Sequence, residues 1–228
     1  MTAAASLGGS RRRRKVVFWR HGRTSWNSAG RFQGQEDIAL DEVGRQQAAS
    51  AAALLAAIGP TRIISSDLER ARHTAEALAR VTGLPVAEDP RLRETHAGAW
   101  QGMTFAEINA TYPDEAASWS SGAVHVRPGG GESRLEVSER MSAAVLEAAS
   151  GLDDGGTLVV ATHGGAARVG IASLLGLPHD HWGVLSGLAN CNWSLLEETD
   201  GAENPLVNWR LTEHNAGTLP QPVTVQEG

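Results

Sequence analysis

The stretch VVFWRHGRTSWN, residues 16–27, starts with four apolar residues typical of a buried strand and then turns polar at once. Arg20 and His21 stand at the end of this predicted strand, directly before Gly22. A guanidinium and an imidazole at a strand tip either belong to a site at the edge of a sheet or were recruited by the turn. The rest of the chain decides between these two interpretations.

Predicted strands and helices alternate along most of the chain. Strands or extended stretches are expected at 16–20, 62–66, 86–94, 156–165, 190–198 and 205–215, and helices at 41–59, 67–83, 133–150 and 166–178. Asp41 is the expected N-cap of the first helix, and Ser66 or Asp67 that of the second. One short helix is expected within 104–113, followed by an irregular stretch at 112–134. The alternation predicts an α/β fold, a three-layer α/β/α sandwich around a mostly parallel sheet.

The composition and charge exclude several classes of protein. The 228 residues are 41% hydrophobic and 20% charged, as expected for one soluble globular domain. A net charge of −6 argues against a nucleic-acid partner. No apolar run approaches the roughly 20 residues of a membrane span, and no targeting segment is recognised at the N-terminus. The single cysteine, Cys191, excludes an internal disulfide and fits a reducing cytoplasm, where we expect the protein to be.

Three further fragments bring residues suited to phosphate chemistry to the ends of predicted strands. Arg70 lies in the first turn of the second helix, Glu94 ends the third extended stretch, and His163 begins the His-Gly-Gly that closes a later strand. Ligands of open α/β sheets bind at the carboxyl ends of the strands. We therefore expect the four strand tips to form one site.

The residue types at these tips are those that the hydrolysis of a phosphate ester requires. Two arginines present planar donor forks to a phosphate dianion. His21 can attack phosphorus with one ring nitrogen if a backbone carbonyl in the glycine turn holds the other, and His163 can donate to the oxygens as charge develops. A single carboxylic acid, Glu94, can protonate the leaving alkoxide and later activate water. This scheme requires no metal ion.

Four segments resemble the motifs of the histidine phosphatase superfamily, also called phosphoglycerate-mutase-like, and occur in the family's order: WRHGRTSWN, SSDLERARHTA, LRETHAGAWQG and VVATHGG. The resemblance implies that His21 forms a phosphohistidine and that Glu94 is the proton donor. It implies that the phosphate pocket is built by Arg20, Arg70 and His163. It further implies substrate contacts from Asn27, Gln33 and Gly164, and neither a cofactor nor a metal.

The resemblance also divides the chain into parts. Residues 15–215 are expected to form the histidine phosphatase domain, after a disordered basic tail at 1–14 and before a flexible tail at 216–228. The run RRRRK at 11–15 is interpreted as a solvated flank of the first strand, with a nucleic-acid or partner contact as the alternative.

A few positions are left open by the sequence. Arg23 stands where the family usually has Glu or Gln, so it faces either the substrate or the solvent. His96 follows Glu94 closely and is a candidate for the pocket wall, as are the tryptophans 26 and 100. The HDH at 179–181 is interpreted as a loop rather than a metal site, because no third ligand is evident.

The expected partner is a small phosphorylated metabolite, with no nucleic acid and no membrane. Glu94 and His163 are 69 positions apart, which resembles the short phosphatase arrangement rather than that of the mutases. Among the phosphatases, LRETHAGAWQG, GGGESR and NCNW are most similar to actinobacterial enzymes acting on glucosyl-3-phosphoglycerate. The alternatives are a broad-specificity or α-ribazole phosphatase, a phosphoglycerate mutase, and an inactive phospho-ligand-binding pseudo-enzyme. The oligomeric state is open, a homodimer being one alternative.

Overall fold

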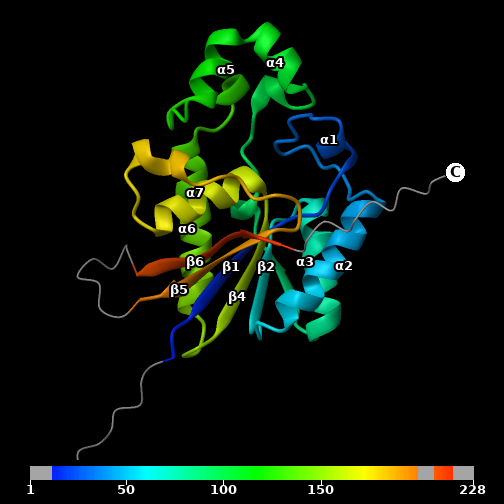
Figure 1. Ribbon diagram of the computed structural model, residues 1–228, viewed down its shortest axis with the longest axis vertical. Helices are drawn as coiled ribbons and strands as arrows, with labels where there is room; N and C mark the ends of the chain where they lie inside the picture. Colours follow the sequence, from blue (N-terminus) through cyan, green and yellow to red (C-terminus); the bar gives the residue numbers. More distant parts are fainter. Residues whose placement is uncertain (1–11, 200–207, 218–228) are drawn as a thin grey trace, which may run out of the picture.

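A six-stranded sheet forms the centre of the molecule (Figure 1). The computed structural model describes residues 12–199 and 208–217. The strands lie in the order β3-β2-β4-β1-β5-β6 and comprise β1 (Lys15–Arg20), β2 (Arg62–Ser65), β3 (Val86–Glu88), β4 (Thr157–Thr162), β5 (Trp193–Glu198) and β6 (Trp209–Ala216). The neighbours among β1 to β4 pair in parallel, whereas β5 runs antiparallel to β1 and β6 antiparallel to β5. The mostly parallel sheet predicted from the sequence is confirmed.

Helices cover both faces of this sheet. One face carries α2 (Glu42–Ala56) and α3 (Glu69–Thr82), and the other carries α6 (Arg134–Ser150) and α7 (Gly164–Leu174) (Figure 1). Strand β1 serves both layers because its side chains alternate. Val16 and Phe18 belong to the core that includes residues of α6 and α7, and Val17 and Trp19 to the core that includes residues of α2 and α3. The predicted three-layer sandwich is confirmed.

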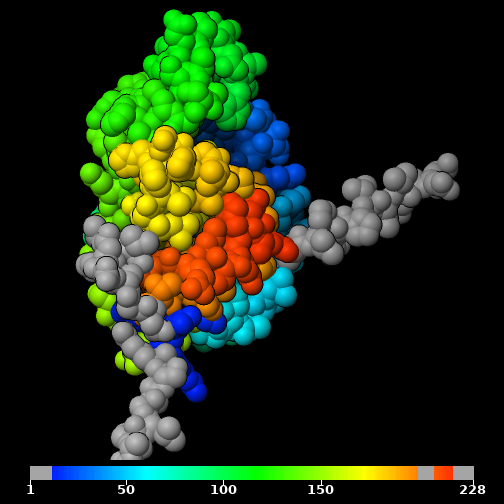
Figure 2. Space-filling model, turned by 60° about the vertical axis from the view of Figure 1, so that its left-hand side comes forward, coloured from blue at the N-terminus to red at the C-terminus, as the bar shows by residue number. Residues whose placement is uncertain are grey.

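A small cap stands beyond the carboxyl edge of the sheet, as Figures 1 and 2 show. It consists of α4 (Phe105–Thr111) and α5 (Pro113–Ser120) and has its own apolar cluster. The short helix expected within 104–113 is confirmed as α4, but the irregular stretch expected at 112–134 was wrong for residues 113–120, which form α5. Pro113 occupies the first turn of α5, where the missing N–H is not needed and the fixed φ favours a helix.

The connections contain several short helical segments: α1 (Ser25–Ser28) and the 3₁₀ turns η1 (Pro90–Leu92), η2 (Gly98–Trp100), η3 (Pro128–Gly130) and η4 (His179–Val184). Within the described residues, no helix is both long and apolar enough to cross a membrane.

The N-cap predicted from the sequence is confirmed for α2 but not for α3. Asp41 caps α2, since its Oδ1 accepts from the Gly44 N–H at 2.8 Å. The capping of α3 by Ser66 or Asp67 was wrong, because its N-cap residue is Leu68 and makes no side-chain cap. Asp67 pairs instead with Arg93, and Ser66 Oγ accepts from the N–H of the N-cap residue Leu68, at 3.3 Å, and lies 2.9 Å from the His163 Nε2 atom.

The ends of the domain differ slightly from their expected places. Residues 1–11 and 218–228, which make up most of the two predicted tails, lie outside the described residues. Arg14 is held against the domain, because its Nε donates to Glu198 at 2.9 Å and its Nη1 to the Ala149 carbonyl at 2.9 Å. Arg14 therefore differs from the solvated flank expected there, and strand β6 extends to Ala216.

Candidate active site

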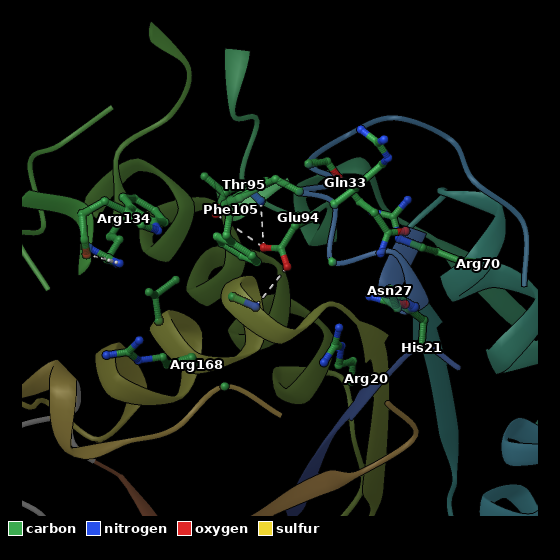
Figure 3. Close-up of a pocket in the computed structure, with 18 residues that line it drawn as sticks. Arg20, His21, Asn27, Gln33, Arg70, Glu94, Thr95, Phe105, Arg134 and Arg168 are labelled. Carbon is green, nitrogen blue, oxygen red and sulfur yellow. Dashed lines mark hydrogen bonds between the residues drawn. The ribbon is translucent and has the colours of Figure 1, made fainter. Parts of the chain in front are cut away.

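A cavity of about 300 Å³ opens at the carboxyl ends of β1, β2 and β4 (Figure 3). Of the eight predicted site residues, six line it: Arg20, His21, Asn27, Gln33, Arg70 and Glu94. The other two lie close by without lining it. His163 is fully buried with its ring centroid 5.1 Å from that of His21, and Gly164 is replaced in the wall by its neighbour Gly165.

His21 is held in one tautomer by the turn that follows β1. Its Nδ1 lies 2.7 Å from the Gly22 carbonyl oxygen, which accepts the ring proton and leaves Nε2 with the lone pair. Burial lowers the pKa of His21 well below its usual value, and the charges of Arg70 and Arg20 lower it further. The imidazole is therefore neutral at pH 7, as a nucleophile must be.

Arg70 connects the cavity to the buried second histidine. Its two terminal nitrogens donate to the carbonyl oxygens of Glu36 and Gly34, each at 2.7 Å. Its Nε donates to His163 Nδ1 at 3.2 Å, so the proton of that ring lies on Nε2 and is directed to Ser66. Burial lowers the pKa of Arg70 to about 10, which keeps its charge at neutral pH.

His163 is neutral as well, because burial lowers the pKa of its imidazole well below the usual value, with Arg70 as the second cause. The sequence predicted that His163 donates to phosphate oxygens, but in this structure its Nε2–H is engaged by Ser66 Oγ at 2.9 Å. The ring orients Arg70 through its other nitrogen.

Arg20 carries a donor that is free for a ligand. Its Nη1 donates to the Leu188 carbonyl at 2.6 Å, but its buried Nε finds no hydrogen-bond partner within the described part of the chain. A buried donor without a hydrogen-bond partner destabilises the fold by about 1–3 kcal/mol, and by more when it belongs to a charged group. An anion beside Arg20 would relieve this penalty.

Glu94 lies at the N-terminus of α7, where both of its oxygens accept backbone protons. Oε2 accepts from Gly165 at 3.0 Å, and Oε1 accepts from Ala166 and Thr95, each at 2.9 Å (Figure 3). A Cβ atom at position 165 would lie 2.8 Å from Oε1, so glycine permits this approach. Behind the side chain, Arg140 donates to the Glu94 carbonyl at 2.9 Å and fixes the backbone.

Two amide side chains complete the wall near His21. The Oδ1 atom of Asn27 accepts from the Thr24 N–H at 3.1 Å and from Asn190 Nδ2 at 3.2 Å. The Oε1 atom of Gln33 accepts from the Thr24 hydroxyl at 3.0 Å. Because protein donors occupy the oxygens, the NH₂ groups of both amides are available to donate into the cavity.

This constellation of a tautomer-fixed histidine, two buried arginines and a carboxylate fits the sequence motifs named above. The family model of the histidine phosphatase superfamily (branch 1) matches residues 16–212. The chain belongs to the histidine phosphatase superfamily. The resemblance drawn from its four motifs is thereby confirmed.

Named relatives and solved structures match most of the chain. Glucosyl-3-phosphoglycerate phosphatase of Mycolicibacterium vanbaalenii is 43% identical over 214 residues, which cover 89% of this chain and 95% of the relative. The solved structure of a mycobacterial glucosyl-3-phosphoglycerate phosphatase with VO3 is 39% identical, with a TM-score of 0.82, and the match covers 91% of this chain and all of that one. A protein of Erwinia tasmaniensis named "Probable phosphoglycerate mutase GpmB" is 37% identical over 187 residues, 80% of this chain and 84% of its own.

Several residues that the sequence left open do not line the cavity of this histidine phosphatase. Arg23 pairs with Asp41 at 2.8 Å, outside the wall. His96 is exposed, and Trp100 is buried in the core of the cap. Trp26 is also absent from the wall, to which the cap contributes Trp119 and Phe105 instead. In the described residues, no group of three or more His, Cys, Asp or Glu is placed to hold a metal ion, the HDH segment included.

Other site residues of this histidine phosphatase were missed. Asn190 donates both to the His21 carbonyl at 3.1 Å and to Asn27, so it joins two parts of the wall. Three more arginines line the cavity, Arg31, Arg134 and Arg168. The two latter lie within long predicted helices, where periodicity separates buried from exposed faces but does not reveal a face that borders a cavity.

Proposed function

We propose that this protein is a phosphatase that hydrolyses glucosyl-3-phosphoglycerate, or a closely related phosphorylated acid, through a phosphohistidine on His21. The observation that carries the proposal is the neutral His21 ring, whose Nδ1–H is held by the Gly22 carbonyl in a cavity that also contains Arg20 and Arg70. The substrate is suggested by the relatives named glucosyl-3-phosphoglycerate phosphatase, which match nearly the whole chain.

In the first step, the phosphate of the substrate binds between Arg20 and Arg70, with Asn27 and Gln33 donating to its remaining oxygens. The Nε2 lone pair of His21 forms the bond to phosphorus as the bond from phosphorus to the ester oxygen breaks. The departing alkoxide takes the proton of Glu94, which enters this step as the carboxylic acid. The products are the free alcohol and the phosphohistidine.

In the second step, water attacks the phosphorus of the phosphohistidine. Glu94, now a carboxylate, accepts a proton from this water, and the P–N bond breaks to return the lone pair to His21. Inorganic phosphate then leaves. His163 lies behind the reacting ring, with its ring centroid 5.1 Å from that of His21, and keeps Arg70 in place through its Nδ1 atom.

A phosphoglycerate mutase is the second candidate, because relatives at 37% identity bear that name. A mutase must keep its phosphohistidine from water until the second substrate position is phosphorylated. The chain between Glu94 and His163 contains the small cap, the 3₁₀ turns η2 and η3, α6 and β4, and the cavity below the cap is open to solvent (Figure 2). This openness favours transfer to water and hence the phosphatase.

A cytoplasmic location stays a prediction that rests on the single cysteine.

The deciding experiment follows the fate of the phosphate. Purified protein is mixed with glucosyl-3-phosphoglycerate, and inorganic phosphate and acid-labile phosphohistidine are measured over time. We expect stoichiometric phosphate release and a transient phosphoenzyme that is absent from His21→Ala. Transfer of phosphate between positions of 3-phosphoglycerate, without net release, would establish the mutase. Binding without release or phosphoenzyme would establish a pseudo-enzyme.

A further inference from the structure

The cavity has positive charge at both of its ends. In Figure 3, Arg20 and Arg70 lie with His21 on one side of Glu94, and Arg134 and Arg168 lie on the other. A phosphate needs only the first end. The second pair of arginines therefore calls for its own explanation.

Helix α7 lays out the two ends along one of its faces. A Cβ atom at Gly164 would lie 3.3 Å from Arg20 Nε, and the Gly165 N–H donates to Glu94 at 3.0 Å. Arg168 is four residues beyond Gly164 and so projects from the same face, about 6 Å further along the axis. The helix thus places a phosphate-binding arginine, the proton donor and Arg168 in a row.

Arg168 keeps most of its binding capacity. Its Nε and Nη2 make long hydrogen bonds, 3.4 and 3.3 Å, to a single carbonyl, that of Trp182. Within the described residues it forms no ion pair with a carboxylate. Turning the side chain toward a ligand would break only these two weak contacts.

Two other arginines that line the cavity are already engaged. Arg31 pairs with Glu107 at 3.6 Å, which balances its charge. Arg134 donates through both terminal nitrogens to the carbonyls of Ala123 and Trp119 and stacks on the Trp119 ring at 3.5 Å, but no carboxylate of the described residues pairs with it. Burial lowers the pKa of Arg134 to about 10, and the nearby charge of Arg168 acts in the same direction. The like charges of Arg134 and Arg168 therefore favour an anion in the part of the cavity that separates them from the phosphate end.

We propose that Arg168 binds a carboxylate of the substrate and so selects phosphorylated hydroxy acids over phosphorylated neutral alcohols, with Arg134 adding charge. The choice of a carboxylate rests on the proposed function, since a phosphoglycerate carries an acid three carbons from its phosphate. That length is comparable to one helical turn, the separation of Gly164 and Arg168 on α7. A guanidinium and a carboxylate can pair through two parallel hydrogen bonds.

The test compares 3-phosphoglycerate with glycerol 3-phosphate, which differ only in whether the far carbon is a carboxylate or a hydroxymethyl group. Each is measured as a competitive inhibitor of p-nitrophenyl phosphate hydrolysis, so that a constant is obtained whether or not it is turned over. The proteins are the wild type, Arg168→Gln, Arg168→Lys and Arg31→Gln. The last removes a cavity arginine whose charge Glu107 balances.

We expect the wild type to bind 3-phosphoglycerate about 10- to 100-fold more tightly, the range for one hydrogen-bonded charged group. Arg168→Gln should reduce this preference to about threefold or less, mainly by weakening the binding of 3-phosphoglycerate. Arg168→Lys should retain part of the preference. Arg31→Gln should retain the full preference. No preference in the wild type, or an undiminished one in Arg168→Gln, overturns the inference.

A separate measurement distinguishes this inference from the proposed function. Turnover of glucosyl-3-phosphoglycerate by the wild type tests the function alone. If this turnover is efficient while the Arg168→Gln preference is unchanged, the function stands and the role of Arg168 is wrong. If the preference depends on Arg168 but the sugar phosphate is not hydrolysed, the cavity selects a different phosphorylated acid.

Discussion

The Nδ1 atom of His21 lies 2.7 Å from the carbonyl oxygen of Gly22, the next residue in the chain. Helix α2 closes this turn from the outside. A Cβ atom at Gly22 would approach the Gly44 carbonyl oxygen to 2.4 Å, and one at Gly44 would approach the Arg23 carbonyl oxygen to 2.0 Å. The orientation of the nucleophile therefore depends on two glycines as well as on the histidine itself.

Replacing Gly22 with alanine should lower both activity and stability. The new methyl group meets backbone atoms, which can yield only if the turn moves away from α2, and such overpacking decreases the free energy of unfolding by about 1–3 kcal/mol. Urea unfolding and kcat on p-nitrophenyl phosphate measure the two effects. Gly183→Ala is the control, because a Cβ atom there has no neighbour within 4 Å among the described residues. Equal behaviour of the two variants would contradict the packing argument.

Removing the His21 imidazole should abolish turnover. We expect His21→Ala to lose at least about 10⁴-fold in kcat, as when other covalent nucleophiles are removed. His73→Ala is the matched control, since this histidine lies on α3 and pairs with Glu69 at 3.5 Å. Near-wild-type turnover by the purified His21 variant would rule out the phosphohistidine.

Glu94→Gln should affect substrates according to their leaving groups. A glycerate or sugar alkoxide needs a proton to depart, whereas a nitrophenolate needs little help, so phosphoenzyme formation should fall by about 10²–10⁴-fold only for the former. Rapid-quench bursts with a sugar phosphate and with p-nitrophenyl phosphate measure this difference. Hydrolysis of the phosphoenzyme should slow for both, because the base is missing as well.

If Glu94 only held the start of α7 and transferred no proton, Glu94→Gln would give a different pattern. The glutamine also loses one of the acceptors for the N–H groups of α7, which would disturb both substrates alike. A wild-type burst rate with the sugar phosphate would show that another group is the acid.

The two buried histidines should make the protein less stable in acid. Their pKa values are lowered well below 6.5 in the folded protein, so below about pH 6.5 only the unfolded chain takes up these protons. The free energy of unfolding should fall as the pH decreases through this range, by up to about 2.7 kcal/mol per pH unit for both rings, and these rings should add no slope above it. Urea unfolding of the wild type and His21→Ala between pH 5 and 8 checks this. The variant should show a clearly shallower acid slope, and an identical slope would contradict the assignment.

Activity should be unaffected by EDTA, because the proposed steps use side chains alone. The measurement is the rate on p-nitrophenyl phosphate before and after dialysis against the chelator. Inactivation that a divalent ion reverses would contradict the scheme, and His179 and His181 of the HDH segment would then be the first positions to substitute.

The sequence was most informative where local geometry decides the structure. A strand followed by Arg-His-Gly predicted both the sheet edge and the carbonyl that holds His21, because that oxygen belongs to the residue next to the ring in the chain. Asp41 was predicted as a cap for the same reason, since an N-cap acts within its own turn.

Contacts between distant segments could not be predicted in this way. The first N–H of α3 is satisfied by Asp37, from the loop before α2, while the expected cap Asp67 pairs with Arg93. Arg168 resembles any helical arginine in the sequence, and only the packing of α7 against the cavity places it in the wall. The proton of His163 points to Ser66 because Arg70 occupies the opposite nitrogen, which no local pattern encodes.

The cap has its own apolar core around Trp100, Ile108 and Ala116, and it reaches the cavity through Phe105 and Trp119. The groups that we propose to hold and transfer the phosphate come instead from the sheet edge and its adjoining loops. In the proposed scheme the chemistry and the carboxylate contact of Arg168 belong to the scaffold, while the cap supplies aromatic side chains to the remaining organic part of the substrate. Exchanging α4 and α5 between relatives is accordingly the change most suited to giving this scaffold a new substrate while its rate on p-nitrophenyl phosphate is retained.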